Sequence, residues 1–190
     1  MTGIILSGGE NSRMGRNKAF LTVDGKRLID RMIRIFRGLF AEVILVTNKP
    51  RDYLDLDVTV VTDIYPGRKA LGGIYTGLFY AKDSHAFVAA CDMPFLNAEF
   101  IAYMMERALP YDIVVPQAAD GPQPLHAVYA RKCLPAIKNS LLRDKLKVTG
   151  FYKGLKVLFI PEETIQAFDP RARMFLNVNT PEDLIRLESD

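Results

Sequence analysis

Residues 4–18 have the sequence IILSGGENSRMGRNK. The apolar run Ile4-Ile5-Leu6 predicts a buried strand, and the residues that follow it include three glycines, two arginines and a lysine. Glycine lets the backbone come close to a ligand, and successive main-chain N–H groups can form a concave anion site. Arg13 and Lys18 add full positive charges. The stretch therefore predicts a loop that binds a polyanion, and the simpler alternative is an ordinary connection between a strand and a helix.

Two well-known phosphate-binding loops do not fit this stretch. A P-loop needs a Gly-Lys pair followed by Ser or Thr, whereas Lys18 stands between Asn17 and Ala19. The dinucleotide-binding fingerprint needs a second glycine two positions after the first, and two positions after Gly8 stands Glu10. We therefore expect a phosphate loop of another type.

The bulk composition indicates an ordinary globular protein. The 190 residues are 49% hydrophobic and 25% charged, which suits one compact α/β domain spanning 1–190. The formal net charge of +3 is too small to indicate a nucleic-acid partner. No apolar run approaches the length of a membrane span and no secretory signal is visible, so we expect neither membrane insertion nor export.

The two cysteines favour a location in the cytoplasm. Cys91 ends an apolar run, and Cys133 is the other of the two cysteines. Two buried thiols are the favoured interpretation over a disulfide, which fits a reducing cytoplasm. The sequence contains no Cys/His cluster with the spacing of a zinc site.

Short β-rich runs alternate with segments of helical periodicity along the chain. This alternation favours βαβ units, and thus an α/β fold with a mostly parallel sheet. The expected strands are Gly3–Ser7, Val43–Thr47, Val58–Thr62, Ala86–Cys91, Asp112–Val115, Ala127–Tyr129 and Lys156–Ile160. The expected helices span 28–40, Gly72–Lys82 and Asn97–Leu109, with Asn97 as N-cap, and a last one follows Thr180.

The last helix has a clear start signal. Thr180 fits the N-cap position and Pro181 the first helical position. Glu182 and Asp183 then suit the positive end of the helix dipole.

Asp92 follows the apolar run Ala86–Ala90. A carboxylate at the end of a buried strand is costly unless it is paired or bound to a metal. Magnesium prefers one or two carboxylates together with phosphate oxygens and water. We therefore interpret Asp92 as a magnesium ligand, and the alternative is an aspartate that accepts hydrogen bonds from nearby backbone amides.

Other polar residues also follow expected strands, and in open α/β sheets ligands bind at the carboxyl ends of the strands. Asp63 follows the third strand, where a structural turn before Pro66-Gly67 is the alternative. Gly72 and Gly73 begin an expected helix, so their N–H groups would face a ligand. Thr47 and Asn48 suit a base or a ribose edge, although a solvated loop explains them nearly as well.

Together these parts describe nucleotidyl transfer. An acceptor phosphate would attack the α-phosphorus of a nucleoside triphosphate, and pyrophosphate would leave. The acceptor is already an anion, so positioning and charge stabilisation carry most of the catalysis. Arg13 and Lys18 would neutralise the triphosphate, and Asp92 would hold a magnesium ion that bridges phosphate oxygens.

The segment Leu6 to Lys18 resembles the nucleotidyltransferase signature L-x-G-G-x-x-x-R-M-G-x-x-K at every defined position. The segment 175–184, FLNVNTPEDL, is similar to the N-V-N-T-P-E-[DE]-L segment of the molybdenum cofactor guanylyltransferase family. The second segment discriminates, because many other nucleotidyltransferases share only the first. The resemblance implies a Rossmann-like three-layer sandwich of the nucleotide-diphospho-sugar transferase type. It also implies transfer of GMP from GTP to molybdopterin, with Mg²⁺ as cofactor.

The resemblance also suggests residue roles. Arg13, Lys18 and Asp92 would be catalytic, and Asp92 would bind the metal. Asn177 and Asn179 would contact the molybdopterin, although an asparagine-rich turn before a capped helix is the alternative. Proteins that deliver and collect the cofactor are further implied partners. The implied nucleotide-binding residues are Leu6, Ser7, Gly8, Gly9, Lys18, Thr47, Asn48, Asp63, Gly72, Gly73 and Asp92.

The sequence leaves several alternatives open. Lys69-Ala70 stands where many members have Gly-Pro, and the late Gly-x-Arg pattern is replaced by 142–145, LRDK. His126 could contact substrate or be structural. A cytidylyltransferase, a sugar-1-phosphate nucleotidyltransferase and a nucleotide-binding protein without turnover remain the rival functions.

Overall fold

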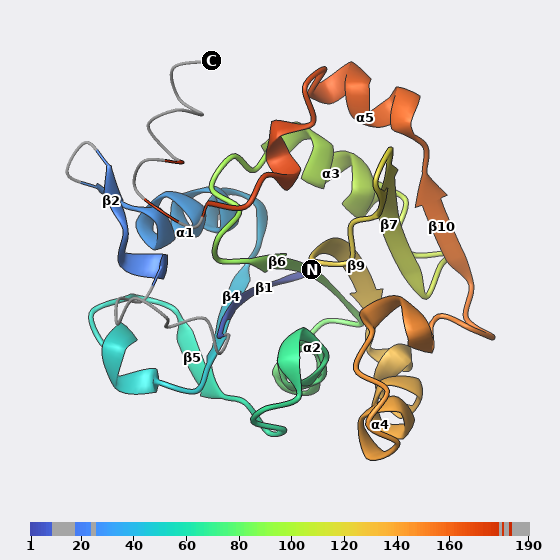
Figure 1. The fold of residues 1–190 in the computed structure, drawn as a ribbon, viewed down its shortest axis with the longest axis horizontal. Helices are drawn as coiled ribbons and strands as arrows, with labels where there is room; N and C mark the ends of the chain where they lie inside the picture. Colours follow the sequence, from blue (N-terminus) through green and yellow to red (C-terminus); the bar gives the residue numbers. More distant parts are fainter. Residues whose placement is uncertain (9–17, 24–25, 179, 181–182, 184–190) are drawn as a thin grey trace.

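The structure, a computed structural model, describes residues 1–8, 18–23, 26–178, 180 and 183. Its centre is a sheet in the strand order β10-β7-β9-β6-β1-β4-β5, with β8 beside β7 (Figure 1). The strands are β1 (Thr2–Ser7), β4 (Glu42–Thr47), β5 (Thr59–Thr62), β6 (His85–Ala90), β7 (Ile113–Ala118), β8 (Gly121–Pro122), β9 (His126–Ala130) and β10 (Val157–Ile160). A separate antiparallel pair joins β2 (Thr22–Val23) to β3 (Lys26–Arg27).

Most neighbouring strands run parallel, as the sequence predicts. β1 is parallel to both β4 and β6, β4 to β5, and β7 to β10. β9 is antiparallel to β6 and β7. The carboxyl ends of β6, β1, β4 and β5 therefore meet at one edge of the sheet.

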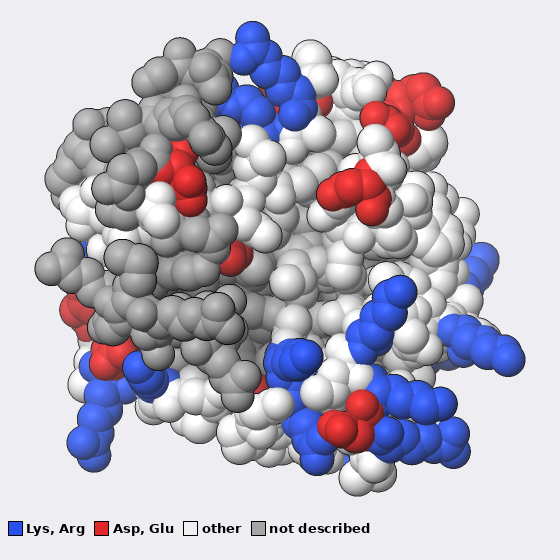
Figure 2. Space-filling model, viewed as in Figure 1, with Lys and Arg blue, Asp and Glu red and all other residues white. Residues whose placement is uncertain are grey.

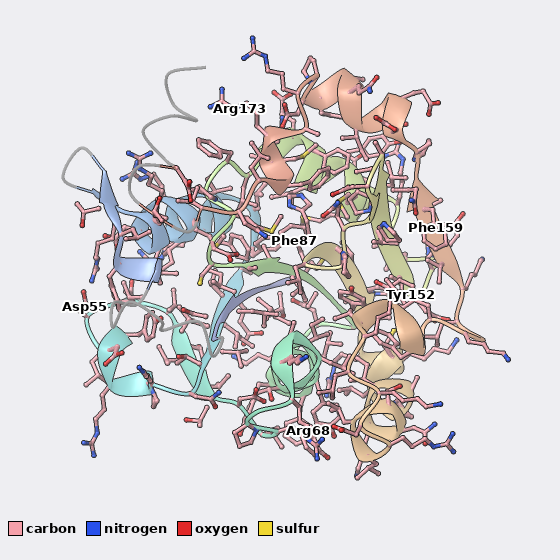
Figure 3. The ribbon with its side chains drawn as sticks, viewed as in Figure 1. Asp55, Arg68, Phe87, Tyr152, Phe159 and Arg173 are labelled. Atoms are coloured by element: carbon pink, nitrogen blue, oxygen red, sulfur yellow. The ribbon has the colours of Figure 1, made fainter. Side chains whose placement is uncertain are left out.

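Helices cover both faces of the sheet, which gives the three-layer α/β sandwich (Figure 1). One face carries α1 (Leu28–Leu39), α3 (Ala98–Glu106) and α5 (Glu162–Phe168), and the other carries α2 (Lys69–Tyr80) and α4 (Leu134–Leu142). Each face of the sheet has its own hydrophobic core. Phe87 belongs to the core beneath α1, α3 and α5, and Tyr152 to the core beneath α2 and α4 (Figure 3). Among the described residues, no helix is long and apolar enough to cross a membrane.

Most predicted elements are confirmed, with corrected boundaries. Asn97 caps α3, because its Oδ1 accepts a hydrogen bond from Phe100 N at 2.9 Å. β7 runs on through Pro116 to Ala118, where the sequence predicts an end at Val115. The Thr180 hydroxyl accepts from Asp183 N at 3.1 Å, as expected of an N-cap. The remaining residues of the last predicted helix lie outside the described part of the chain.

Candidate functional site

Pairing of the parallel strands brings the predicted site residues to one edge of the sheet. Ser7 on β1 pairs with Thr47 on β4, and Thr47 pairs with Thr62 on β5. Asp63 N donates to the Thr47 carbonyl at 3.4 Å. On the other side of β1, Cys91 N donates to Leu6 O at 3.0 Å, so Asp92 begins the loop after β6 at the same edge. The loops that carry Gly8, Asp63 and Asp92 therefore leave the parallel strands β1, β5 and β6 in one direction.

The glycine-rich loop leaves β1 at a fixed point. The Ser7 side chain is buried, and its hydroxyl is hydrogen-bonded to the hydroxyl of Tyr53, which is fully buried in the 3-10 helix Pro50–Tyr53. Gly8 is exposed, and a Cβ built on it would meet none of the described residues within 4 Å. Among the described residues, nothing blocks the close approach of a ligand to the backbone at Gly8.

The loop returns at the 3-10 helix Lys18–Phe20. Phe20 packs against Tyr53 with ring centroids 5.0 Å apart. Tyr53 thus holds both ends of the loop, through Ser7 and through Phe20. Gly9, Arg13 and the side chain of Lys18 lie outside the described part of the chain.

Asp63 is held by hydrogen bonds to one of its two carboxylate oxygens. Oδ1 accepts from Tyr65 N at 2.9 Å and from the Thr76 hydroxyl at 2.8 Å. The Thr76 hydroxyl in turn accepts from Ile64 N at 2.9 Å. Oδ2 lies 3.1 Å from the position that a Cβ on Gly72 would take.

The sequence predicts that Gly72 and Gly73 begin a helix. In the structure they lie within α2, which starts at Lys69. Gly72 N donates to Arg68 O at 3.2 Å, so the expectation that it faces a ligand is wrong. The two glycines instead allow close packing. A Cβ on Gly72 would stand 2.8 Å from Tyr65 O, and one on Gly73 would stand 3.1 Å from a methyl group of Leu6.

The two polar residues after β4 differ in exposure. Thr47 is buried, and its hydroxyl accepts from Lys49 N at 3.1 Å. Asn48 is exposed. Asn48 therefore presents its side chain at this edge, whereas the Thr47 hydroxyl is used by its own turn.

Asp92 brings the C-terminal segment to the same edge. Its carbonyl oxygen accepts from Val178 N at 2.8 Å, and Val178 is fully buried against Leu28. Asn177, which precedes Val178, is exposed, and Asn179 lies outside the described residues. The predicted pterin-side segment and the predicted metal ligand are thus hydrogen-bonded neighbours.

The donor set at Asp92 fits a magnesium ion that substrate phosphates help to hold. The described residues contain no group of three or more His, Cys, Asp or Glu side chains that could bind a metal ion. Asp92 is partly exposed, and it follows β6, which pairs with β1, the strand that precedes the glycine-rich loop. Magnesium at such sites takes one or two carboxylates, phosphate oxygens and water.

His126 is structural in this fold. It is fully buried among the rings of Phe87, Phe100 and Phe175, whose centroids lie 5.0, 5.9 and 5.1 Å from its own. Neither ring nitrogen has a hydrogen-bond partner among the described residues. Burial lowers the pKa of His126 to about 3. A substrate contact would need an exposed ring atom, so the structural interpretation holds.

Thr76 and Tyr53 hold the residues at this edge in place, and neither is predicted from the sequence as a site residue. Thr76 had one usable signal, because it is a polar residue inside the apolar pattern of 71–78. Tyr53 had none, since its link to Ser7 joins residues 46 positions apart.

A family model described as a MobA-like NTP transferase domain matches residues 3–155. The chain is 40% identical to a protein named "Probable molybdenum cofactor guanylyltransferase" from Pelotomaculum thermopropionicum, over 97% of this chain and 90% of that protein. It is 38% identical to a "Molybdenum cofactor guanylyltransferase" from Desulfosudis oleivorans, over 100% and 95%.

The chain is also similar to a solved structure. It is titled molybdopterin-guanine dinucleotide biosynthesis protein A, from Archaeoglobus fulgidus, and it superposes with a TM-score of 0.82. The two chains are 28% identical, over 100% of this chain and 97% of that one. The protein therefore belongs to the family with a MobA-like NTP transferase domain, and it is a nucleotidyltransferase.

Proposed function

We propose that the protein transfers GMP from GTP to the phosphate of molybdopterin in the molybdenum cofactor and releases pyrophosphate. The observation that carries the proposal is the identity of 40% over nearly the whole chain to a protein named as a probable molybdenum cofactor guanylyltransferase. The 175–184 segment supports the same substrate, because its sequence resembles the family's discriminating motif and its residue Val178 donates a hydrogen bond to Asp92 O.

The order of the strands supports different roles for Asp92 and Asp63, at opposite ends of the bound nucleotide. Asp92 follows β6, which is next to β1 and its glycine-rich loop. Asp63 follows β5, which is three strand positions from β6. Neighbouring strands lie about 4.8 Å apart, so the two strands that carry these aspartates are about 14 Å apart. Asp92 is therefore suited to the phosphates and Asp63 to the nucleoside.

In the proposed reaction, an oxygen of the molybdopterin phosphate attacks the α-phosphorus of GTP. A new P–O bond forms, the bond to the β-phosphate oxygen breaks, and pyrophosphate takes the electron pair. Arg13 and Lys18 bind the triphosphate and offset its charge, and Gly8 lets the backbone approach it. Asp92 holds Mg²⁺, which when bound neutralises charge on the phosphate oxygens.

Different residues are proposed to bind the acceptor and the nucleoside. We assign Asn177 and Asn179 to molybdopterin binding, and Asn48 and Asp63 to nucleoside binding. Cys133 Sγ donates a hydrogen bond to Asp112 O at 3.3 Å, as a thiol does. We propose the cytoplasm as the compartment and cofactor-delivery proteins as partners there.

The proposal is tested by pyrophosphate release from each of the four nucleoside triphosphates, with molybdopterin and Mg²⁺ present. We expect GTP to be the preferred substrate and release to require the pterin. Preference for CTP would replace the proposal with a cytidylyltransferase. Turnover with a sugar 1-phosphate in place of molybdopterin would replace it with a sugar nucleotidyltransferase.

Single substitutions test the proposed roles. Asp92→Ala, Arg13→Ala and Lys18→Ala should each lower kcat about 100-fold or more, because each removes charge stabilisation of the phosphates. Asp120→Asn is the matched control, since Asp120 is exposed in the turn between β7 and β8. Wild-type magnesium dependence in Asp92→Ala would remove Asp92 from the metal site.

A further inference from the structure

Thr76 places a polar group inside the packed face of α2. The residue is fully buried, and its neighbours Leu71, Ile74 and Leu78 belong to the apolar core between α2 and the sheet. A buried hydroxyl is costly unless it is hydrogen-bonded. The Thr76 hydroxyl meets this requirement by joining two hydrogen bonds at the end of β5.

The direction of these two bonds is fixed. Ile64 N–H can only donate, so the Thr76 oxygen accepts from it at 2.9 Å. The single hydroxyl hydrogen of Thr76 is then directed to Asp63 Oδ1, at 2.8 Å. Tyr65 N–H donates to the same Oδ1 at 2.9 Å. Oδ1 therefore accepts two hydrogen bonds, and the carboxylate plane of Asp63 is held in one orientation.

This orientation leaves the other oxygen for a ligand. None of the described residues donates a hydrogen bond to Asp63 Oδ2, and Asp63 is only partly buried. Oδ2 faces the first turn of α2 at Gly72, where a Cβ would stand 3.1 Å from it. A carboxylate oxygen only accepts hydrogen bonds, so its ligand must present a donor such as a hydroxyl or amino group.

We propose that Thr76 is a positioning residue for nucleotide binding, which holds Asp63 so that Oδ2 accepts a hydrogen bond from a hydroxyl or amino group of the nucleoside. The proposal rests on the proposed function for the identity of that nucleotide. It assigns Thr76 no contact with the substrate. Its effect on binding passes entirely through the Asp63 carboxylate.

Three variants separate positioning from simple structural support. Thr76→Val keeps the shape of the side chain but removes the hydroxyl, and Thr76→Ser restores it. Thr2→Val is the matched control, because Thr2 is also fully buried and its hydroxyl contacts the carboxylates of Glu42 and Asp83. Thr2 begins β1, so it lies at the edge of the sheet opposite the site.

The first measurement is equilibrium binding of GTP, followed by KM and kcat with molybdopterin. Thr76→Val should weaken GTP binding and raise KM about tenfold, the value of one hydrogen bond to a charged group, with kcat within about twofold of wild type. Thr76→Ser should bind as wild type does. Thr2→Val should lose thermal stability without a change in binding. Wild-type affinity in a folded Thr76→Val protein would overturn the proposal.

A double-mutant cycle tests whether the effect passes through Asp63. Asp63→Asn should weaken binding, and adding Thr76→Val to it should cause little further loss, because the two residues act as one unit. Independent, additive losses would overturn the proposal. They would show that Thr76 supports the fold rather than the carboxylate.

Failure here is distinguishable from failure of the proposed function, because binding is measured without the acceptor. Before the variants are measured, the four nucleoside triphosphates are compared with wild-type protein, and if another binds more tightly than GTP it replaces GTP in the binding measurements. Weaker binding of that nucleotide by Thr76→Val supports the inference even if molybdopterin is not the acceptor. Binding of no nucleotide by the wild-type protein would overturn both proposals.

Discussion

At the scale of single residues, His126 makes the stability of the protein depend on pH. Its pKa is lowered by burial from 6.5 to about 3. Between these values the unfolded chain binds a proton that the folded protein does not, so the free energy of unfolding falls as the pH falls below 6.5. Well between the two pKa values, the free energy of unfolding falls by about 1.4 kcal/mol for each pH unit. We expect a loss of about 1 kcal/mol between about pH 6.5 and 5.5, measured by urea unfolding.

His126→Leu is the comparison that isolates this residue. It removes both unpaired ring nitrogens, so we expect it to be neutral or stabilising at neutral pH and to lose the pH dependence above pH 5. Carboxylates such as Asp112 titrate lower, because the backbone N–H of Lys156 holds the pKa of Asp112 below its usual range. The same slope in both proteins would show that His126 is not its source.

Some residues of the candidate site can be predicted from the sequence, and others cannot. Asp63 and Asp92 could be located from sequence, because each follows an apolar strand and parallel strands end at one edge. Their proposed roles remain predictions. Thr76 could not be connected to Asp63 in the same way, because their hydrogen bond depends on how α2 packs against the end of β5.

At the scale of elements, the start of α2 shows why boundaries are harder to predict than the elements themselves. The helix was expected from Gly72, but it begins at Lys69, whose φ is +52°. A lysine in this left-handed region is uncommon, and no local pattern in the sequence indicates it. The substitution of Lys69-Ala70 for the family's Gly-Pro falls on this position, so the family's glycine would suit the backbone better than the lysine does.

This strain gives a stability prediction for α2. Lys69→Gly should raise the free energy of unfolding by about 1 kcal/mol, because glycine adopts a positive φ without the Cβ penalty. Lys69→Ala is the control, since it removes the same charge but keeps the Cβ. Urea unfolding of the three proteins measures the difference. Equal stability of the Gly and Ala variants would show that the backbone at position 69 relaxes without cost.

At the scale of the whole molecule, positive charge is concentrated in one segment. Residues 131–156 hold eight of the 25 Lys and Arg residues but one of the 22 acidic residues, so this segment carries +7 and the rest of the chain −4. Figure 2 shows the concentration at the lower right, over α4 and the residues after it. Arg68, at the start of α2, is paired with Asp144 of this segment, so the basic surface adjoins the candidate site (Figure 3).

This surface should speed the capture of anionic substrates. GTP and the pterin phosphate are both polyanions, and a field of one sign beside a site raises the rate of association. Lys145 and Lys147 are exposed and form no ion pair within the described part of the chain. Replacing both by Glu should lower kcat/KM about tenfold at low salt with kcat unchanged.

The salt dependence of that loss decides its cause. The Debye length falls from about 30 Å at 0.01 M salt to about 3 Å at 1 M, so a long-range attraction disappears over this range, whereas a direct contact with substrate persists. Arg34→Glu with Arg107→Glu makes the same change in net charge on α1 and at the end of α3, across the sheet from α4. We expect that control to alter kcat/KM far less at every salt concentration. If both pairs reduce kcat/KM equally, net charge alone is responsible; if the Lys145 and Lys147 effect survives high salt, these side chains touch the substrate.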